Sequence, residues 1–530
     1  MQRFRQLSAG VLAIGLAIFS AHGHAQGTAL LNIVFVLDGL RPDAINAADT
    51  PVLYKLRTEG VNFTNSHSVF PTVTRVNATS LGTGTYPARH GIMSNNIYVP
   101  DVNATAAFSN DSMRNLLKMD EVTGGKTVMA TTLSEMLEAA GRKMVVVSSG
   151  SSGGAFLLAP KAPQGIGVLI HAESTEQLPV AYPAAVAAEI TRRFGAPPKK
   201  GGARDHYTAS VDWTMRVLGD YVLPELKPQV IFAWLTEPDH TQHAFGSNAP
   251  ETVATIRNDD RQLGVILDRL QALGLRDKTN IMVVSDHGFS HSVYGVNVRQ
   301  ELREAGFVPG VESEDVVIAS SGQAVLLHVK NRDPVKIAEI ATFLKKRPWC
   351  GVLFTAADVA GPAHLGRVPG TLSLELIHLG GNPRSADIAL TFPWSSALNR
   401  FGAAGTDYQL VSVGSRTGPM DGTQSNHGSM SPWTVRNTML AWGPDFKRGV
   451  TLRTPSANVD VTPTLLHLAG VRSVGVLDGR VLNEALAGGP DQEKLMTETR
   501  TLRAEEGTYR VVIQVTEAGG KRYIDKSWRE

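Results

Sequence analysis

Short apolar runs that each stop at a cluster of polar residues recur along this chain. They are the segments 31–40 (LNIVFVLDGL), 143–150 (KMVVVSSG), 229–240 (QVIFAWLTEPDH) and 280–288 (NIMVVSDHG). Each run is rich in β-branched residues and has the length of a strand that is buried on both faces. The pattern therefore predicts parallel strands that deliver polar side chains at their carboxyl ends.

Helical patterns lie between these runs, over 130–141, 206–223 and 251–273. In the last of these, apolar residues with a period near 3.6 share one face: Val253, Ile256, Leu263, Leu267 and Leu270. Strands that alternate with helices predict an α/β fold with a mostly parallel sheet between helix layers. Ligands of such sheets bind beyond the carboxyl ends of the strands. Here those ends carry Asp38, Asp239, Asp286 and His287.

Three polar or glycine-rich segments interrupt this alternation and predict insertions: 99–128, 195–205 and 295–425. The longest of them contains short strand patterns, and we expect it to form a cap. At the end of the chain, residues 509–528 are typical of a hairpin with a glycine turn. The sequence thus predicts one catalytic domain over 26–505 and a C-terminal hairpin extension over 506–530.

The first 25 residues have the pattern of a secretory signal peptide, with a basic start, an apolar run and small residues before a cleavage site after Ala25. An uncleaved N-terminal anchor is the alternative. No later stretch has the length of a membrane span. We therefore expect a periplasmic or secreted protein with no membrane span once the signal is removed.

Composition adds a second constraint, because 42% of the residues are hydrophobic and 19% are charged, as in a globular protein. Loss of Arg3 and Arg5 with the signal lowers the Lys and Arg count from 51 to 49, equal to the 49 Asp and Glu. A neutral chain gives no general electrostatic basis for binding a nucleic-acid polymer. The single cysteine, Cys350, lies among apolar residues and is predicted to be a buried structural thiol.

Candidate metal ligands stand in three motifs. Asp239 and His243 in EPDHTQHAFG are four residues apart, on one face of a helical turn. Asp286 and His287 in SDHG end a strand, where Gly288 permits the backbone to turn. His427 lies in the glycine-flanked loop GTQSNHGSMSP. Carboxylate oxygen together with imidazole nitrogen suits zinc and, less selectively, manganese or iron.

Each motif alone has an ordinary structural explanation. The Asp-x-x-x-His pair is typical of a helix start with a surface histidine, SDHG of a turn, and His427 of a solvated loop. Asp38 is compatible with a helix cap. Together these groups fall at strand ends or in glycine-flanked loops, and this coincidence favours a metal site.

The segment FPTVTRVNATSLGTG places Thr74 at the expected N-terminus of a helix. Backbone N–H groups and the helix dipole favour a phosphate there. A threonine hydroxyl becomes a good nucleophile when a metal lowers its pKa. The structural alternative is that Thr74 is the N-cap of the helix, and the predicted metal cluster favours the nucleophile.

These motifs, in order, resemble the nucleotide pyrophosphatase/phosphodiesterase branch of the alkaline phosphatase superfamily. The matching pieces are VLDGLRPD, FPTVTRVNATSLGTGTYPARHGIMSNN, EPDHTQHAFG, SDHGF, NHGSMSP and NVDVTPTLLHLAG, and they span residues 31 to 470. The resemblance implies an alkaline-phosphatase-like α/β core with two divalent ions, most simply zinc, at the strand ends. It also implies hydrolysis of a small phosphoester substrate.

Carried over by position, the resemblance assigns one ion to Asp38, Asp286 and His287, with Thr74 also reaching it. It assigns the other ion to Asp239, His243 and His427. Asn95 matches an asparagine that donates to a phosphate oxygen. Thr74 would attack phosphorus with one ion at its hydroxyl, and the other ion would stabilise the leaving oxygen and then supply hydroxide to cleave the phosphothreonine.

Arg75 departs from the family pattern, because nucleotide-cleaving relatives carry an aromatic residue directly after the nucleophile. A guanidinium can stack, but it also pairs with phosphate or carboxylate. Arg75 is therefore expected either to bind an anionic substituent or to form a surface salt bridge. A nucleotide substrate does not follow from the sequence, which also does not define the oligomeric state.

The choice of ester rests on a second departure. Some monoesterase relatives grip a doubly charged phosphate with a Lys-x-Arg pair, but the comparable segment 148–160 has neither residue. This favours a phosphodiester. A phosphomonoesterase, a phosphonate hydrolase and a metal-bearing binding protein remain alternatives. A sulfatase is disfavoured, since TVTRV stands where a modified Cys or Ser is needed.

Overall fold

The structure is a computed structural model that describes residues 27–530 except 174–177, 200, 203, 310–314 and 413. The predicted signal peptide, residues 1–25, lies outside the described residues. Within the described residues, no helix is both long enough and apolar enough to cross a membrane.

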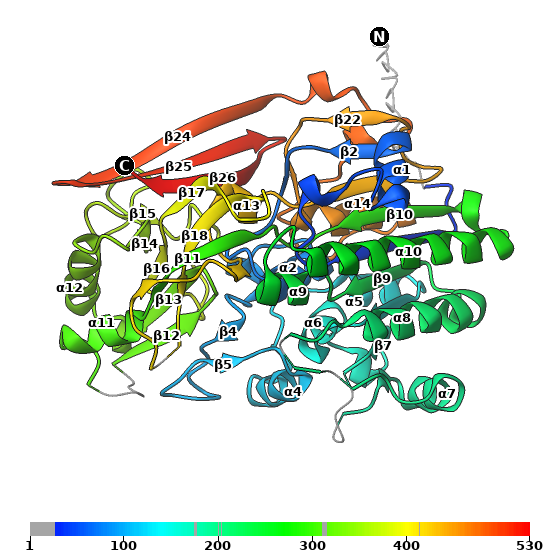
Figure 1. Cartoon of the computed structure of the whole chain (residues 1–530), viewed down its shortest axis with the longest axis horizontal. Helices are drawn as coiled ribbons and strands as arrows, with labels where there is room; N and C mark the ends of the chain where they lie inside the picture. Colours follow the sequence, from blue (N-terminus) through cyan, green and yellow to red (C-terminus); the bar gives the residue numbers. More distant parts are fainter. Residues whose placement is uncertain (1–26, 174–177, 200, 203, 310–314, 413) are drawn as a thin grey trace, which may run out of the picture.

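The central sheet contains every strand predicted from the apolar runs. In the part of the chain that the structure describes, it has nine strands in the order β22-β2-β21-β10-β1-β9-β6-β7-β8 (Figure 1). The parallel centre consists of β10 (Thr279–Val284), β1 (Leu31–Leu37), β9 (Val230–Leu235), β6 (Met144–Ser148) and β7 (Val168–His171). The edges consist of β21 (Met439–Trp442), β2 (Val61–Phe63), β22 (Val450–Leu452) and β8 (Ala181–Tyr182). The α/β prediction with a mostly parallel sheet is confirmed.

Helices cover both faces of this sheet, because alternate strand residues point to opposite sides. On one side Val34 and Val36 share a core with α2 (Thr74–Thr83), α5 (Leu133–Ala139), α6 (Ser152–Leu158) and α14 (Val461–Ala469). On the other side Ile33 and Phe35 pack with α1 (Pro51–Glu59), α7 (Ala184–Phe194), α8 (Thr208–Val217) and α10 (Pro250–Ala272). The helix predicted over 251–273 is α10, and its predicted apolar face buries Ile256, Leu263 and Leu270.

The register of the three middle strands sets the position of the site. Val36 of β1 lies opposite Val284 of β10 and Trp234 of β9. The three strands therefore end at nearly the same level, and the residues that follow them emerge side by side. Asp38, Asp239 and Asp286 all follow these ends within a few residues.

Residues 295–425 form a second lobe beside the central sheet, with its own core and with strands in two smaller sheets (Figure 1). Its strands include β12 (Val316–Ser320), β13 (Ala324–Val329), β16 (Ile388–Thr391), β14 (Leu353–Thr355) and β18 (Ala404–Leu410). Helix α12 (Pro334–Lys345) packs into the same core. Cys350 is fully buried there as a free thiol, as predicted.

The C-terminus forms an antiparallel sheet of three strands, among the described residues, that is separate from the central sheet. Strands β25 (Tyr509–Ala518) and β26 (Lys521–Arg529) occupy the segment for which the sequence predicts a hairpin. Strand β24 (Thr497–Glu506), which the sequence pattern did not indicate, pairs with β25. Gly519 and Gly520 both have positive φ in the turn between β25 and β26.

Candidate two-metal active site

The predicted ligands meet at the carboxyl ends of β1, β9 and β10. Asp38 follows β1, Asp286 and His287 follow β10, and Asp239 begins helix α9 (Asp239–Phe245) after β9. Two groups of side chains offer possible ligand atoms, and within each group these atoms lie within 4.8 Å of one another. One group is Asp38, Asp286 and His287, and the other is Asp239, His287 and His427. The structure thus brings together residues that are up to 389 positions apart in the sequence.

Two glycines permit this close approach for different reasons. Gly39 has φ +69° and donates its backbone N–H to Asp286 Oδ1 at 3.0 Å, which links the ends of β1 and β10. Gly288, expected to allow a turn, has no positive φ; instead, a Cβ there would lie 2.1 Å from the carbonyl oxygen of Trp433. The loop after His287 is therefore tight because another backbone passes against it.

Three carboxylate oxygens at the centre of the site lack a conventional partner. Asp38 Oδ1, Asp239 Oδ1 and Asp286 Oδ2 are buried and have no hydrogen-bond partner among the described residues. A buried carboxylate without compensation is costly unless it is protonated or binds a cation. This set of oxygens, together with imidazole nitrogens, fits divalent metal ions of the zinc type.

The three histidines are oriented as metal ligands. In each of them Nδ1 faces a backbone carbonyl, that of Gly288 for His287, of Ser425 for His243 and of Thr72 for His427, at 3.0 to 3.1 Å. The carbonyl accepts from Nδ1–H, so the neutral ring presents the Nε2 lone pair to the site. Nε2 of His287 lies 3.1 Å from Asp286 Oδ2, and Nε2 of His427 lies 3.4 Å from Asp239 Oδ1. A lone pair directed at a carboxylate favours a cation between them.

Electrostatics within the cluster support the same conclusion. Burial, and then the charges of Asp286 and Asp239, raise the pKa of Asp38 well above its usual range. Burial also raises the pKa of Asp286. Burial and the nearby His287 lower the pKa of His427 well below its usual range, so this imidazole is neutral at physiological pH. Metal-free carboxylates here repel one another, and a divalent ion relieves that repulsion.

Thr74 is the first residue of α2 and faces the metal cluster. Its Oγ1 lies 3.4 Å from Nε2 of His287. Val73, not Thr74, occupies the N-cap position, and neither residue makes a side-chain cap bond. The alternative that Thr74 is the N-cap is therefore wrong, and its hydroxyl is oriented toward the site.

Asn95 and Arg75 both lie next to Thr74. The Asn95 side-chain oxygen accepts from the backbone N–H of Arg75 at 3.0 Å, so the amide group of Asn95 is held beside Thr74 with its NH₂ as the donor. The Arg75 side chain forms an ion pair with Asp111 and donates to Ser151 Oγ at 2.9 Å. Arg75 thus lines the cavity and forms the salt bridge that was one of the two expectations, while binding of an anionic substituent stays a prediction.

Two supporting features escaped sequence reasoning. Trp234 Nε1–H donates to Asp38 Oδ2 at 2.9 Å and orients that carboxylate. A buried chain of amides, Asn437 to Asn458 to Asn77, joins the loop after β10 to helix α2. The sequence motif NVDVTPTLLHLAG contained Asn458, but no pattern in the sequence indicated its partners.

Replacement of Trp234 by phenylalanine tests its role. Trp234→Phe removes the donor to Asp38, and we expect about 10- to 100-fold weaker zinc binding, the usual cost of losing a group that orients a ligand. Metal affinity is measured by competition with a chromophoric chelator. The matched control is Trp213→Phe, because Trp213 is a buried tryptophan whose Nε1 has no partner among the described residues. Equal affinity of the two variants would contradict this role for Trp234.

A polar cavity of about 230 Å³ opens beside Thr74. It is lined by Asp38, Thr74, Arg75, Asp111, Ser148, Ser151, Gly154, Tyr207, Trp234, Thr236, Asp239 and His240. The rings of Tyr207 and His240 stack with 3.8 Å between their centroids and form one wall. The cavity is large enough for a phosphate and part of its substituent.

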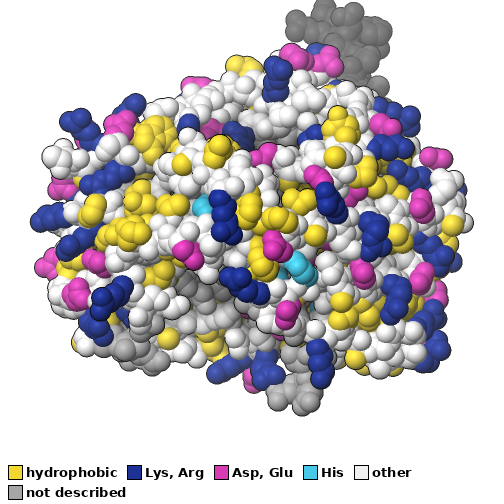
Figure 2. Space-filling view, in the orientation of Figure 1, with side chains coloured by type: hydrophobic (Ala, Val, Ile, Leu, Met, Phe, Trp, Pro, Cys, Tyr) yellow, Lys and Arg dark blue, Asp and Glu magenta, His cyan; other side chains and the backbone are white. Residues whose placement is uncertain are grey.

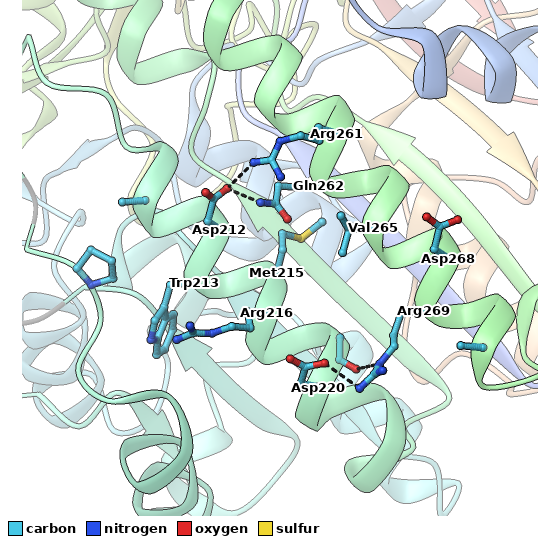
Figure 3. Close-up of a pocket in the computed structure, with 14 residues that line it drawn as sticks. Asp212, Trp213, Met215, Arg216, Asp220, Arg261, Gln262, Val265, Asp268 and Arg269 are labelled. Carbon is cyan, nitrogen blue, oxygen red and sulfur yellow. Dashed lines mark hydrogen bonds and ion pairs between the residues drawn. The ribbon is translucent and has the colours of Figure 1, made fainter.

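A larger cavity of about 810 Å³ lies between α8 and α10, away from these residues (Figure 3). Four of its six charged side chains pair with one another, Arg261 with Asp212 and Arg269 with Asp220, and Gln262 also donates to Asp212. Such a surface has few unmet polar groups to bind a ligand. The unpaired carboxylates beside Thr74, rather than cavity volume, identify the candidate active site.

A threonine hydroxyl beside two groups of carboxylates and histidines is typical of metal-dependent phosphoester hydrolases. The family model of type I phosphodiesterase/nucleotide pyrophosphatase matches residues 32–395, and the chain belongs to this family. Its members are two-metal hydrolases of phosphoric ester bonds. His427 lies beyond the matched residues, so its place in the site rests on the geometry above.

Several characterised proteins are similar to this chain. Venom phosphodiesterase 2 of Crotalus adamanteus is 26% identical over 48% of the chain, and human ectonucleotide pyrophosphatase/phosphodiesterase family member 1 is 24% identical over 48%. The matched segment spans about a quarter of the length of these relatives (26% and 23%). The structure of murine ectonucleotide pyrophosphatase/phosphodiesterase 5 superposes with a TM-score of 0.58 and 17% identity, covering 86% of this chain and 100% of that one. This last likeness shows the fold.

Proposed function

We propose that this chain is a two-metal phosphodiesterase that acts through a phosphothreonine intermediate on Thr74. The observation that carries the proposal is the position of the Thr74 hydroxyl at the start of α2. Its Oγ1 lies 3.4 Å from His287 Nε2 and faces the carboxylate oxygens that have no hydrogen-bond partner among the described residues. A related structure supports it: an inactive threonine-to-alanine variant of murine ectonucleotide pyrophosphatase/phosphodiesterase 5 is described in complex with AMP.

In this proposal Asp38, Asp286 and His287, with Thr74, hold one ion, and Asp239, His243 and His427 hold the other. Zinc is the ion that this mixture of ligands suits best. When bound, the two ions lower the pKa of the attacking hydroxyl and neutralise charge on the leaving oxygen. In the structure His287 belongs to both groups of possible ligand atoms, and His243 Nε2 lies 3.5 Å from Asp239 Oδ1.

The chain's own residues orient the phosphate. The N-terminus of α2 attracts it, as at other helix N-termini, although the N–H of Arg75 is already bound to Asn95. The NH₂ group of Asn95 is positioned to donate to an oxygen that is not bridging. Thr74 Oγ1 then attacks phosphorus, the bond to the departing alkoxide breaks, and a water hydrolyses the phosphothreonine to regenerate the hydroxyl.

A diester is the preferred substrate in this proposal. The segment 148–160, which lines the cavity with Ser148, Ser151 and Gly154, contains neither lysine nor arginine to hold a second phosphate charge. On the face shown in Figure 2, Lys/Arg and Asp/Glu side chains are interspersed and do not form a stripe of one sign. Both features favour a small phosphoester over a nucleic-acid polymer. Action in the periplasm or outside the cell is part of the same proposal.

The test is hydrolysis of bis-p-nitrophenyl phosphate and p-nitrophenyl phosphate by zinc-loaded protein, with Thr74→Ala protein purified in parallel. We expect kcat/KM for the diester to exceed that for the monoester by about tenfold or more, because no lysine or arginine of the segment 148–160 pairs with the second negative charge of the monoester. A monoester preference would contradict the substrate class. Turnover of neither ester, with two ions bound, would contradict phosphoester hydrolysis and favour a phosphonate hydrolase or a binding protein.

A further inference from the structure

Arg75 has an unusual position for an arginine in a site rich in carboxylates. Among the described residues that line the cavity it is the one lysine or arginine. Its side chain is only 13% exposed, whereas that of its partner Asp111 is 58% exposed. The pair therefore joins a guanidinium inside the cavity to a carboxylate at its mouth.

The backbone of Arg75 is fixed on both sides. Its N–H donates to Asn95, and its carbonyl accepts from Thr79 Oγ1 at 2.8 Å. The guanidinium is fixed by Ser151 and Asp111, while its Nε has no hydrogen-bond partner among the described residues. Arg75 is thus held in one place, with a buried Nε that has no partner among the described residues.

Charge balance shows what Asp111 does to this site. Asp38, Asp239, Asp286 and an ionised Thr74 carry four negative charges, which two divalent ions would offset. Among the described residues that line the cavity, the remaining charges are those of Arg75 and Asp111, and these cancel. Glu173 adds a further negative charge within electrostatic reach of Arg75. A site with this balance suits a phosphodiester, which has one negative charge, better than a phosphomonoester, which has two near neutral pH.

We propose that Asp111 is a specificity-determining residue that pairs with Arg75 and so keeps the site selective for phosphoesters with a single negative charge. This inference rests on the proposed function and names the residue that limits its substrate class. It accounts for an arginine directly after the nucleophile in a chain whose other features favour a diester. Without Asp111, the fixed guanidinium would be free to pair with the second charged oxygen of a monoester.

The experiment compares wild-type protein, Asp111→Asn and the double variant Asp111→Asn/Arg75→Gln, all loaded with zinc. For Asp111→Asn we expect the ratio of kcat/KM for p-nitrophenyl phosphate to that for bis-p-nitrophenyl phosphate to rise about tenfold. The reason is that the positive charge of Arg75, in a partly buried site, is then no longer offset by Asp111. In the double variant the gain should disappear. The matched control is Asp101→Asn, at an exposed aspartate in the segment 99–128 that also contains Asp111, and it should leave the ratio unchanged.

A second measurement needs no turnover. Titration calorimetry of inorganic phosphate into each zinc-loaded protein should show about tenfold tighter binding to Asp111→Asn than to wild type, and this gain should require Arg75. The exposed position of Asp111 makes misfolding an unexpected outcome, and thermal unfolding of each variant checks it. Tighter phosphate binding that persists without Arg75, or an unchanged ratio and affinity in Asp111→Asn, would overturn the inference.

The two proposals fail in different ways. If wild-type protein hydrolyses neither ester, the proposed function is wrong, and phosphate binding still tests the role of Asp111. If wild-type protein hydrolyses the diester but Asp111→Asn loses activity on both esters equally, the function stands and the inference is wrong. Such a loss would mean that Arg75 needs Asp111 in order to bind any phosphate.

Discussion

Thr74→Ala protein should lose at least about 10³-fold in kcat for bis-p-nitrophenyl phosphate, the scale of loss seen when a nucleophile is removed from a covalent mechanism. The loss should be in kcat, because the two sets of metal ligands and the helix N-terminus remain to bind the substrate. Thr74→Ser, which keeps a hydroxyl at the same place, should retain much more activity than Thr74→Ala. Steady-state kinetics and metal analysis of each purified variant measure these effects.

The control for this prediction is Thr83→Ala. Thr83 is a buried threonine at the other end of the same helix, and its Oγ1 donates to the carbonyl of Thr79 at 2.7 Å. Its loss should affect stability slightly and turnover little. If Thr74→Ala kept more than about a tenth of wild-type kcat with full metal content, a direct attack by water would be the better mechanism.

Removal of the metal ions should abolish turnover and lower stability together. A chelated and dialysed protein loses the activation of Thr74, so we expect at least about a 10³-fold loss of kcat that added zinc restores. Zinc at about 1,000 times its dissociation constant should also stabilise the fold by about 4 kcal/mol for a single site. Thermal unfolding with and without zinc measures this. A chelated protein with full activity and an unchanged melting temperature would contradict the metal assignment.

The pH dependence of the metal-free protein follows from Asp38. Burial and the neighbouring carboxylates raise its pKa, so the folded metal-free chain binds more protons than the unfolded chain above the usual range of an aspartate. This contribution favours folding at low pH and is lost as the pH rises through the raised pKa. Zinc displaces the proton, and its apparent affinity should therefore rise as the pH rises through the raised pKa of Asp38. At high pH the metal-free protein should therefore be less stable to unfolding, and the zinc-loaded protein should not show this decrease in stability.

The sequence predicted four strands of the central sheet, β1, β6, β9 and β10, and the positions of the candidate ligands, because both follow local rules. Apolar runs of strand length indicated β1, β9 and β10, and parallel strands place their carboxyl ends at one edge. Asp38 and Asp286 stand directly after such runs, so their meeting needed no knowledge of distant contacts. His427 was found by its loop composition and by resemblance, since no strand pattern leads to it.

The supporting residues could not be predicted because they depend on register and on distant loops. Trp234 reaches Asp38 because β9 pairs beside β1, and in the sequence it is one more apolar residue of a buried run. Asp111 lies in the segment 99–128, whose polar composition predicted only an insertion. The amide chain through Asn458 and Asn77 joins residues 381 positions apart. Such contacts are set by tertiary packing, which a local pattern does not encode.

The C-terminal sheet shows the same limit at a larger scale. Glycine in a turn predicted a hairpin, but β24 is exposed along most of its length and lacks the apolar alternation of a strand. The sheet joins the two lobes, since Tyr509 and Val511 pack into the core of the second lobe and Asp525 accepts from the ring of His67 at 2.9 Å. Its place therefore depends on partners that lie far away in the sequence.

The most direct test of the central claim is the stereochemistry at phosphorus. A single diastereomer of a phosphorothioate diester is hydrolysed by zinc-loaded protein in ¹⁸O-labelled water, and the configuration of the product is read by ³¹P NMR. Each in-line displacement inverts phosphorus, so attack by Thr74 followed by attack by water gives net retention. Net inversion would show a single displacement by water and would contradict a phosphothreonine intermediate.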